Sequence, residues 1–507
     1  MDFTAPLIGK IHYSACVFLP ISWTREVQMK KTAALLCALS LFISCKPEVE
    51  ETPVSGTVSA DYLVGRQTIE GFGACNAWKS LPDDETVSDE IVELLFSRTA
   101  GMGLSILRTR IPFRENPGDY QDGFFSPNED DTYNYTVSGE AVFDWDTWEV
   151  NNTRELIEAI SDLGSDGPED LTVMATPWTP VNAWKIWVPD AELPAYGGYI
   201  DSTKYAEYAD VLADFANQYA ANMGEDLDVL SVQNEPNYIP TSYESCGWFA
   251  SQISDFLKVL GPRFSAKGVS DDLRIMAAEP MNFEEDMVLP ALADSEASAV
   301  LDIVGVHQYD HDEEDNMAAK PLSTVSASGK ALWETEVSDG ETNDPSITDG
   351  IYWAKLVHLD LTDAEVNAFL YWWLWGNPNT KSPLLGLRED NTLLYNKRVY
   401  TIGQFSRFIR PGWQRVYGNT KTGDGVYCSF YKDPDDTQFA AVIVNSQGNS
   451  FDLELSVSGI SGFSALSAWR TSADENIEQI EDPSADGTVI SITLPESSVT
   501  TVTGTIE

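Results

Sequence analysis

Short apolar runs alternate with helical stretches between about residue 66 and residue 375. Eight of these runs are short and apolar, which predicts buried strands. They cover residues 68–72, 104–109, 171–175, 229–233, 273–278, 301–306, 331–335 and 366–373. Between them, apolar residues recur at helical spacing, for example Tyr208, Leu212, Phe215 and Tyr219. Eight strands, each followed by a helix, predict an α/β fold, a closed parallel (β/α)8 TIM barrel.

The pattern changes after residue 412. Short segments with alternating apolar and polar residues follow, separated by turns rich in Asp, Gly, Asn and Ser, which predicts an antiparallel β-sandwich side domain. The expected strands cover residues 426–431, 439–444, 451–457, 465–469, 489–494 and 499–505, and residues 57–64 could add another. We therefore expect a catalytic barrel over residues 66–412 and a side domain over residues 413–507, preceded by a tether at residues 45–65.

Residues 1–44 have the features of a removable leader. Residues 1–28 show no pattern, and we interpret them as a wrongly assigned start. At Met29 an export signal begins, with Lys30-Lys31 followed by an apolar run at residues 33–43 that is too short to span a bilayer. The run ends in Ser44-Cys45, which resembles a bacterial lipoprotein box with a lipidated cysteine. We expect export and lipid anchoring to the bacterial outer membrane; a plain secretory signal is the alternative.

The overall charge limits the possible partners. Acidic residues outnumber basic ones 80 to 31, giving a formal net charge of −49. Such a charge disfavours nucleic acid and anionic membrane surfaces as partners. Fifteen Trp and twenty Tyr are many for 507 residues and favour a surface that grips a flat, partly apolar ligand.

Cysteine and histidine usage gives no sign of a disulfide framework or a metal site. With Cys16, Cys37 and the expected lipidated Cys45 set aside, Cys75, Cys246 and Cys428 remain, and three thiols cannot all pair. Cys75 and Cys246 both follow expected strands and could pair at the barrel rim, although we favour free buried thiols. The four His show no paired ligand spacing, so we expect no metal and no cofactor.

Carboxylates and aromatic rings follow the expected strands, where a TIM barrel holds its active site. No nucleophilic Ser or Cys stands beside a His there, and no glycine-rich phosphate loop is present. Two acids in an aromatic cleft are what glycoside cleavage needs, one to protonate the leaving oxygen and one to attack or stabilise the anomeric carbon. The residues at these strand ends include Trp78, Arg108, Trp178, Asn234, Glu235, Glu279, His307, Tyr309, Glu334, Glu336 and Trp372.

Two of these acids are the best candidates for the chemistry. Glu235 follows the fourth strand and Glu336 ends the seventh, so they should face each other across the barrel. Glu334 and Glu336 are two residues apart, so in a regular strand their side chains would point to the same face. We favour Glu336 because it lies nearer the strand's end. Glu279 follows the fifth strand beside Pro280, and we interpret it as a turn acid.

Six motifs in order resemble glycoside hydrolase family 30. They are Ile69-Glu70-Gly71-Phe72-Gly73, Leu107-Arg108, Pro177-Trp178-Thr179-Pro180, Ser231-Val232-Gln233-Asn234-Glu235-Pro236, Trp333-Glu334-Thr335-Glu336 and Gln404-Phe405-Ser406-Arg407-Phe408-Ile409-Arg410-Pro411-Gly412. The resemblance implies a barrel fused to a β-sandwich and a retaining mechanism, with Glu235 as acid/base and Glu336 as nucleophile. It also implies substrate-binding positions at Asn234, Trp78, Arg108, Trp178, His307, Tyr309 and Trp372.

Within the family, the motif ending in Asn234-Glu235-Pro236 and the tail Ala468-Trp469-Arg470-Thr471-Ser472 look most like the bacterial xylanase branch. Many members of that branch recognise a glucuronic acid branch on xylan with an Arg just after the Trp pair on strand eight. Here Leu374-Trp375-Gly376-Asn377 follows that pair, without an Arg, and Lys381 or Arg388 could substitute.

The resemblance implies an O-glycosyl hydrolase that cuts plant cell-wall polysaccharide, an endo-β-1,4-xylanase that acts on xylan with or without glucuronate. We expect a monomer. A β-1,6-glucanase or β-1,6-galactanase of the same family is one alternative, and a non-catalytic surface glycan-binding lipoprotein is another.

Overall fold

The computed structural model describes residues 54–112, 145–180, 184–186, 197–240, 243–311, 317, 319–423 and 425–507, together with the backbone of residues 120–121 and 124–125. The expected export signal, Cys45 and the tether up to residue 53 therefore lie outside the described residues and stay predictions. Within the described part, no helix is long and apolar enough to cross a membrane.

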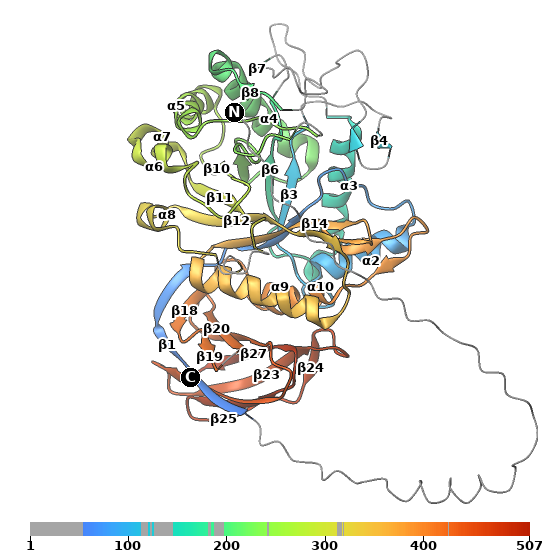
Figure 1. The fold of residues 1–507 in the computed structure, drawn as a ribbon, viewed down its shortest axis with the longest axis vertical. Coiled ribbons are helices and arrows are strands. Elements are labelled where there is room, and N and C mark those ends of the chain that lie inside the picture. Colours follow the sequence, from blue (N-terminus) through green and yellow to red (C-terminus); the bar gives the residue numbers. More distant parts are fainter. Residues whose placement is uncertain are drawn as a thin grey trace, which may run out of the picture. The chain divides into compact units, whose positions relative to one another are not determined.

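Eight parallel strands close into a barrel, which confirms the predicted fold (Figure 1). Hydrogen bonding follows chain order around the barrel, and pairing between the eighth and first strands closes it. All eight expected strands are present, with ends shifted by a few residues. They are β2 (Gly71–Cys75), β3 (Ile106–Arg110), β6 (Thr172–Thr176), β9 (Val229–Ser231), β10 (Arg274–Ala278), β11 (Ile303–His307), β12 (Ala331–Val337) and β14 (Ala368–Gly376).

Amphipathic helices follow the strands and cover the barrel. The helix at Tyr205–Met223 is the one that the apolar spacing predicted, and it ends where Gly224 adopts a left-handed φ of 79°. The described α-helices are α2 (Glu85–Phe96), α3 (Trp148–Asp162), α4 (Tyr205–Met223), α5 (Ala250–Lys267), α6 (Leu289–Ala293), α7 (Ser295–Val300), α8 (Ser323–Ser328), α9 (Ile347–Leu359) and α10 (Lys397–Ser406).

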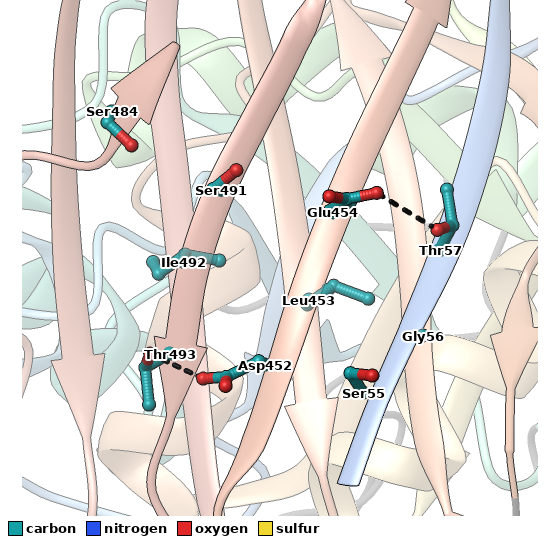
Figure 2. A pocket seen from close by; sticks show the side chains of 10 residues that line it. All are labelled: Ser55, Gly56, Thr57, Asp452, Leu453, Glu454, Ser484, Ser491, Ile492 and Thr493. Atoms are coloured by element: carbon teal, nitrogen blue, oxygen red, sulfur yellow. Dashed lines mark hydrogen bonds between the residues drawn. The ribbon is translucent and has the colours of Figure 1, made fainter. Parts of the chain in front are cut away.

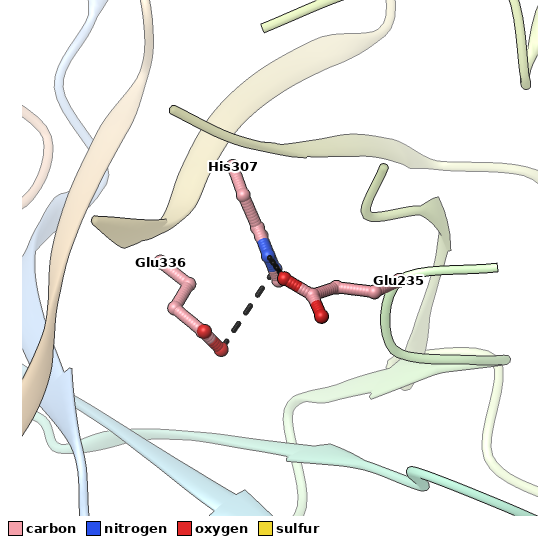
Figure 3. A group of neighbouring side chains, drawn as sticks. All are labelled: Glu235, His307 and Glu336. Atoms are coloured by element: carbon pink, nitrogen blue, oxygen red, sulfur yellow. Dashed lines mark hydrogen bonds and ion pairs between the residues drawn. The ribbon is translucent and has the colours of Figure 1, made fainter. Parts of the chain in front are cut away.

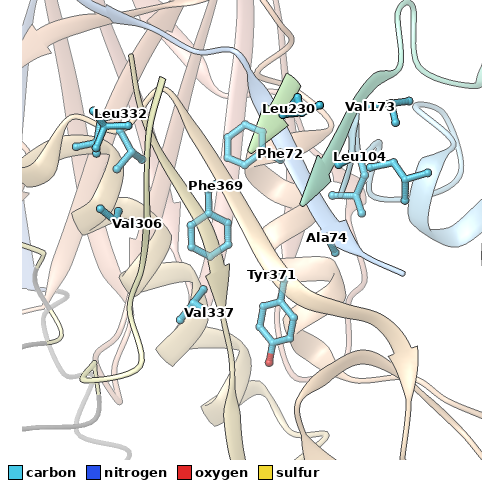
Figure 4. Packing of buried hydrophobic residues seen from close by; sticks show 14 of the residues in the cluster. Phe72, Ala74, Leu104, Val173, Leu230, Val306, Leu332, Val337, Phe369 and Tyr371 are labelled. Carbon is cyan, nitrogen blue, oxygen red and sulfur yellow. The ribbon is translucent and has the colours of Figure 1, made fainter. Parts of the chain in front are cut away.

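Alternation along each strand divides the buried side chains into two layers. One set fills the barrel interior with Ile106, Met174, Val229, Met276, Ile303, Trp333, Ala368 and Leu370. The other set belongs to the larger cluster that includes the helices, and Figure 4 shows several of its members, among them Phe72, Leu230, Val306, Leu332 and Phe369. The interior layer plugs the barrel and leaves the strand ends as the place for polar chemistry.

The side domain is one eleven-stranded sheet around a core of its own. The N-terminal β1 (Val54–Thr68) joins it and pairs antiparallel with β18 and parallel with β22. This strand includes residues 57–64, which the sequence analysis suggested as an additional strand. That parallel pairing departs from the purely antiparallel prediction, because no hairpin links these two strands and fixes their direction. The other strands are β18 (Gln414–Gly418), β19 (Lys421–Thr422), β20 (Val426–Lys432), β21 (Gln438–Asn445), β22 (Phe451–Ser458), β23 (Phe463–Thr471), β24 (Glu478–Ile480), β25 (Ser484–Asp486), β26 (Val489–Leu494) and β27 (Ser498–Ile506).

Helix α10 fastens the side domain to the barrel. The Gln404 amide donates to the Thr471 hydroxyl at 3.0 Å, and its carbonyl accepts from the Thr501 hydroxyl at 2.6 Å. All three side chains are buried, so each hydrogen bond replaces one to water. The contact ties one barrel helix to strands β23 and β27.

The described cysteines are free and buried, which confirms the reading that we favoured. Cys75 packs with Trp178 and Trp372 at the barrel mouth, whereas Cys246 belongs to the cluster between the strands and helices. The Cys75–Cys246 disulfide that the sequence allowed is therefore absent, because the two thiols lie in different clusters.

Candidate active site

Two carboxylates meet at the carboxyl-terminal mouth of the barrel. Glu235 follows β9 and Glu336 lies on β12, three strands around the barrel. Figure 3 shows them pointing toward one another with His307 between them. One ligand atom from each of the three side chains lies within 4.8 Å of the others. Retaining glycosidases hold their two carboxyl groups about 5 Å apart, so this spacing fits a retaining pair.

Backbone contacts from two neighbouring strands hold Glu235 in place. The Glu235 amide donates to the Glu279 carbonyl at 3.0 Å, and the Asn234 amide donates to the Pro177 carbonyl at 2.9 Å. Glu235 has a φ of 43°, in the left-handed region that non-glycine residues rarely adopt, as do Glu279 at 50° and Trp78 at 57°. Such strained residues cluster at functional sites, where the surrounding structure compensates the cost.

A β-bulge aims Glu336 into the barrel. Val306 pairs with Glu334, but His307 pairs with Glu336, so β12 holds one extra residue at this point. Glu334 shares the outer face with Val306, whereas Glu336 turns inward beside His307 and Arg108. The expectation that both glutamates point to the same face was therefore wrong, because the alternation of side chains between faces is interrupted at a bulge.

Arg108 contacts three of the polar side chains in the site. Its guanidinium donates to Glu336 Oε2 at 2.5 Å, to Asn234 Oδ1 at 2.6 Å and to Glu279 Oε1 at 3.1 Å. Its side chain is fully buried, and the plane lies 4.8 Å from the Trp178 ring centroid. This buried cation holds Glu336 and Asn234 in fixed positions, so the geometry favours a positioning role for Arg108.

Glu279 belongs to this network, and the reading of it as a turn acid is wrong. It is fully buried and accepts hydrogen bonds from Arg108, Ser231 and Thr176. Burial alone would raise its pKa, but Arg108 and His307 outweigh burial and hold the pKa at about 2. Glu279 is thus a permanent anion that balances the buried cations. The sequence placed it at a strand end like the other site residues, and its proline neighbour misled the interpretation.

His307 bridges the three carboxylates. Its Nδ1 lies 3.2 Å from Glu235 Oε1, and its Nε2 lies 3.6 Å from Glu279 Oε1. Burial lowers the pKa of His307, yet the surrounding carboxylates, with Glu336 foremost, raise it to about 10. The imidazolium can therefore donate to acids on both sides at neutral pH. Being fully buried, His307 also lies behind the reacting groups.

Glu235 and Glu336 have different surroundings. Burial raises the pKa of Glu235, and the charge of Glu336 raises it further, while the hydrogen bond from His307 opposes both. Glu336 accepts hydrogen bonds from Arg108 and from the Tyr309 hydroxyl, the latter at 2.6 Å. Glu235 therefore tends to keep its proton, as an acid/base role requires, while Glu336 is held beside a buried cation.

Aromatic rings form one side of the mouth. Trp178 and Trp372 have ring centroids 5.9 Å apart, and Trp78 meets both edge-on at 5.5 and 6.2 Å. Trp373 stacks on Trp372 at 5.0 Å, and Tyr243 packs against the group. The structure thus brings together the three tryptophans that the sequence selected. Tyr243 was missed because no motif marks its loop.

Lys79 lies against the segment that follows the Trp pair. Its Nζ lies 3.6 Å from the Trp373 ring centroid, and a Cβ on Gly376 would stand 3.2 Å from it. Among the described residues, no carboxylate lies within ion-pair distance of Lys79. By contrast, Lys381 is held by Asp339 at 3.0 Å and also faces Glu341 and Asp349, while Arg388 lies exposed. Lys381 is therefore already neutralised and poorly suited to replace the missing Arg.

Glu235, His307 and Glu336 also lie close enough together to chelate a metal. However, Glu336 is already paired with the Arg108 cation and with Tyr309, and a second cation would compete with both contacts. We therefore assign no metal to this group.

The side domain has a hollow of its own on the surface of β1, β22, β25 and β26 (Figure 2). Among the described residues, no aromatic ring lines it. Two of its acids are already hydrogen-bonded, because Asp452 accepts from Thr493 at 2.6 Å and Glu454 accepts from Thr57 at 3.3 Å. Because it offers no apolar platform for a sugar ring, we assign this hollow no part in glycan binding.

A TIM barrel whose mouth holds two close carboxylates in an aromatic cleft defines a glycoside hydrolase. Comparison with known proteins then points to a family. Residues 57–300 match the sequence model of O-glycosyl hydrolase family 30, which bears out the resemblance seen in the sequence motifs.

Relatives of known activity resemble the chain over nearly its whole length. Glucuronoxylanase XynC of Bacillus subtilis (strain 168) is 26% identical over 482 residues, which cover 94% of this chain and 98% of that protein. The structure of the family 30 subfamily 8 xylanase Xyn30A from Clostridium acetobutylicum is 27% identical, with a TM-score of 0.69, and the match covers 89% of this chain and 99% of that one. An endo-β1,6-glucanase shares the fold at 19% identity, with a TM-score of 0.67 and coverage of 89% and 94%.

Proposed function

We propose that this O-glycosyl hydrolase cuts β-1,4-xylan internally by a retaining mechanism, with Glu235 as acid/base and Glu336 as nucleophile. The observation that carries the proposal is the pair of carboxylates within 4.8 Å whose surroundings differ as these roles require. Both acids are in place in a hydrolase family, which disfavours the non-catalytic glycan-binding alternative.

In the first step, Glu235 gives its proton to the leaving glycosidic oxygen while Glu336 attacks the anomeric carbon. The bond to the leaving sugar breaks, and an ester forms between Glu336 and the remaining glycan. In the second step, the Glu235 carboxylate removes a proton from water, which attacks the same carbon and releases Glu336. Acid/base assistance of this kind contributes about 10²–10⁴-fold in rate.

The neighbours of the two acids support these steps. Arg108 and Tyr309 each hold one oxygen of Glu336, which fixes the direction of attack. Asn234 accepts from Arg108 through its carbonyl oxygen, so its amide nitrogen is turned away from Arg108 and is suited to a substrate hydroxyl. Trp78, Trp178 and Trp372 supply the ring faces and edges on which sugars pack.

The choice of xylan rests on the relatives. The glucuronoxylanase and the xylanase resemble this chain at 26% and 27% identity over most of its length. The β-1,6-glucanase and β-1,6-galactanase alternatives keep the same fold and chemistry and differ in the glycan bound. The glucanase structure supports the shared fold alone.

If the enzyme distinguishes acidic branches, Lys79 is the best-placed cation to do so. Burial lowers the pKa of Lys79 to about 8, so an ammonium already stripped of some water lies beside Trp373. A carboxylate on a glucuronate branch would restore part of the lost solvation. Lys79 comes from the loop after β2, which explains why attention to the segment after strand eight alone did not reveal it.

A product profile tests the proposed substrate. Glucuronoxylan, arabinoxylan and β-1,6-glucan are digested in parallel, and the oligosaccharides are separated and sequenced by mass spectrometry. We expect a ladder of internal β-1,4 fragments from both xylans and none from β-1,6-glucan. Products from β-1,6-glucan alone would move the assignment to the rival activity, while products that all carry glucuronate at one position would show strict branch dependence.

A further inference from the structure

A polar cluster lies behind β12, on the outer face of the barrel. It consists of Glu334, Asp360 and Gln308, each of them fully buried. Asp360 begins η4 (Asp360–Ala364), the π-helical turn that follows α9. The surroundings are apolar, and Figure 4 shows Val306, Leu332 and Phe369 on this side of the sheet. Acids buried among such residues cost free energy, so their presence calls for a compensating role.

The cluster holds both backbone groups of Glu336. The Glu336 backbone N–H donates to Glu334 Oε1 at 3.2 Å, and the Glu336 carbonyl accepts from the backbone N–H of Gln308 at 3.3 Å. These contacts flank the bulge that turns Glu336 inward. Gln308 directly follows His307, which contacts Glu235. The cluster therefore contacts the backbone of Glu336 and adjoins the histidine that contacts Glu235.

The protonation of the cluster suits this holding role. Burial, followed by the charge of Asp360, raises the pKa of Glu334 well above its usual range. Burial likewise raises the pKa of Asp360, against a hydrogen bond with Gln308. Glu334 Oε2 has no hydrogen-bond partner among the described residues. A neutral Glu334 can accept the Glu336 amide with one oxygen without placing a second negative charge behind the nucleophile.

We propose that Glu334, supported by Asp360 and Gln308, is a positioning residue that sets the β12 bulge and thereby aims the Glu336 carboxylate at the anomeric carbon. The inference rests on the proposed role of Glu336 as nucleophile. It differs from a purely structural role in its consequence: loss of Glu334 slows the covalent step more than it weakens substrate binding.

The rate of covalent trapping measures that step directly. Enzyme is incubated with 2,4-dinitrophenyl 2-deoxy-2-fluoro-β-xylobioside, and the first-order rate of inactivation is compared with KM on xylan. Glu334→Gln keeps the shape and the acceptor oxygen, whereas Glu334→Leu removes the acceptor. Leu332→Ala is the matched control, because Leu332 is buried on the same face of β12 and lies outside the cluster.

We expect Glu334→Leu to lose about 100-fold in trapping rate, the size of loss that a 1 Å misplacement of a reacting group can cause. KM should stay near the wild-type value, Glu334→Gln should restore most of the rate, and Leu332→Ala should lower the thermal midpoint while trapping at the wild-type rate. A folded Glu334→Leu variant that traps as fast as wild type overturns the inference.

Two further outcomes keep the test decisive. If Glu334→Leu fails to fold, Glu334→Asp takes its place, because it keeps the carboxyl but shortens its reach, and it must show the same selective loss of trapping rate. If the probe labels wild-type enzyme elsewhere than Glu336, the proposed function fails. If Glu336 is labelled at the same rate in wild type and in all folded variants, the positioning role of Glu334 is contradicted and the proposed function stands.

Discussion

At the scale of single residues, the site is an arrangement of charges. Arg108 and a protonated His307 stand among Glu235, Glu279 and Glu336, and all five are buried. The two cations neutralise Glu279 and Glu336, so Glu235 is the acid that can keep a proton. Its proposed role as general acid follows from this balance.

The pH profile of kcat/KM should report that proton. Burial and the charge of Glu336 raise the pKa of Glu235 in the folded enzyme, so it holds its proton at higher pH than an exposed glutamate, and activity falls as pH rises through the raised pKa. We expect the alkaline limb of the wild-type profile to lie above the pKa of an exposed glutamate. In Glu235→Ala, assayed with an aryl xylobioside that needs no acid assistance, this limb should vanish, and its persistence would assign the limb to another group.

Glu279 is expected to matter for stability. Glu279→Gln removes the anion that pairs with Arg108 at 3.1 Å inside the barrel. Breaking a buried pair from one side costs about 3–5 kcal/mol, because it leaves the other charge uncompensated. Urea unfolding should show this loss, whereas the exposed control Glu296→Gln should stay within about 0.5 kcal/mol of wild type. Equal stability of both variants would show that Glu279 is not needed to balance Arg108.

At the scale of elements, the strands could be predicted and their local irregularities could not. Eight apolar runs such as residues 229–233 were sufficient to place the strands, because buried parallel strands have few other sequence patterns. The bulge in β12 left no such mark, since Thr335 fits a regular strand. Nor could spacing show that Arg108 gathers Glu279 and Glu336, because that contact depends on how three distant strands meet.

The loop after β2 should influence substrate choice through Lys79. Lys79→Met keeps a side chain over Trp373 but removes the charge, and Lys79→Arg keeps the charge as the matched control. We expect Lys79→Met to lose about ten-fold in kcat/KM on glucuronoxylan relative to arabinoxylan, the scale of one charged hydrogen bond. The wild-type preference should fade as pH rises through about 8, where Lys79 loses its proton. Equal ratios in all three proteins would remove Lys79 from branch recognition.

At the scale of the whole molecule, the N-terminal strand pairs with strands near the C-terminal end of the chain. The N-terminal β1 pairs with β18 and β22, so the side-domain sheet includes strands from both sides of the barrel sequence. Helix α10 adds the Gln404 contact to β23 and β27. The side domain therefore serves as a support that the barrel is tied to, and its described hollow has no aromatic platform.

Loss of the Gln404 contact should lower stability without changing the chemistry. Gln404→Leu removes two buried hydrogen bonds, each worth about 0.5–1.5 kcal/mol. The Thr501 hydroxyl keeps the Gln404 backbone carbonyl as a partner, and the Thr471 hydroxyl keeps the Tyr400 carbonyl. We expect a lower thermal midpoint and an unchanged kcat at temperatures where the variant is folded. A fall in kcat at full folding would show that the side domain acts on the active site.

The assignment of Glu235 and Glu336 is tested most directly by the configuration of the azide product. Glu235→Ala and Glu336→Ala are each incubated with an aryl β-xylobioside and sodium azide, and the product is identified by NMR. Azide that attacks a covalent Glu336 ester displaces it from the β face, whereas azide that fills the space left by Glu336 attacks from the α face. We predict a β-azide and rescued turnover from Glu235→Ala, and an α-azide or no product from Glu336→Ala. An α-azide from Glu235→Ala, or wild-type activity in either variant without azide, would contradict the assignment.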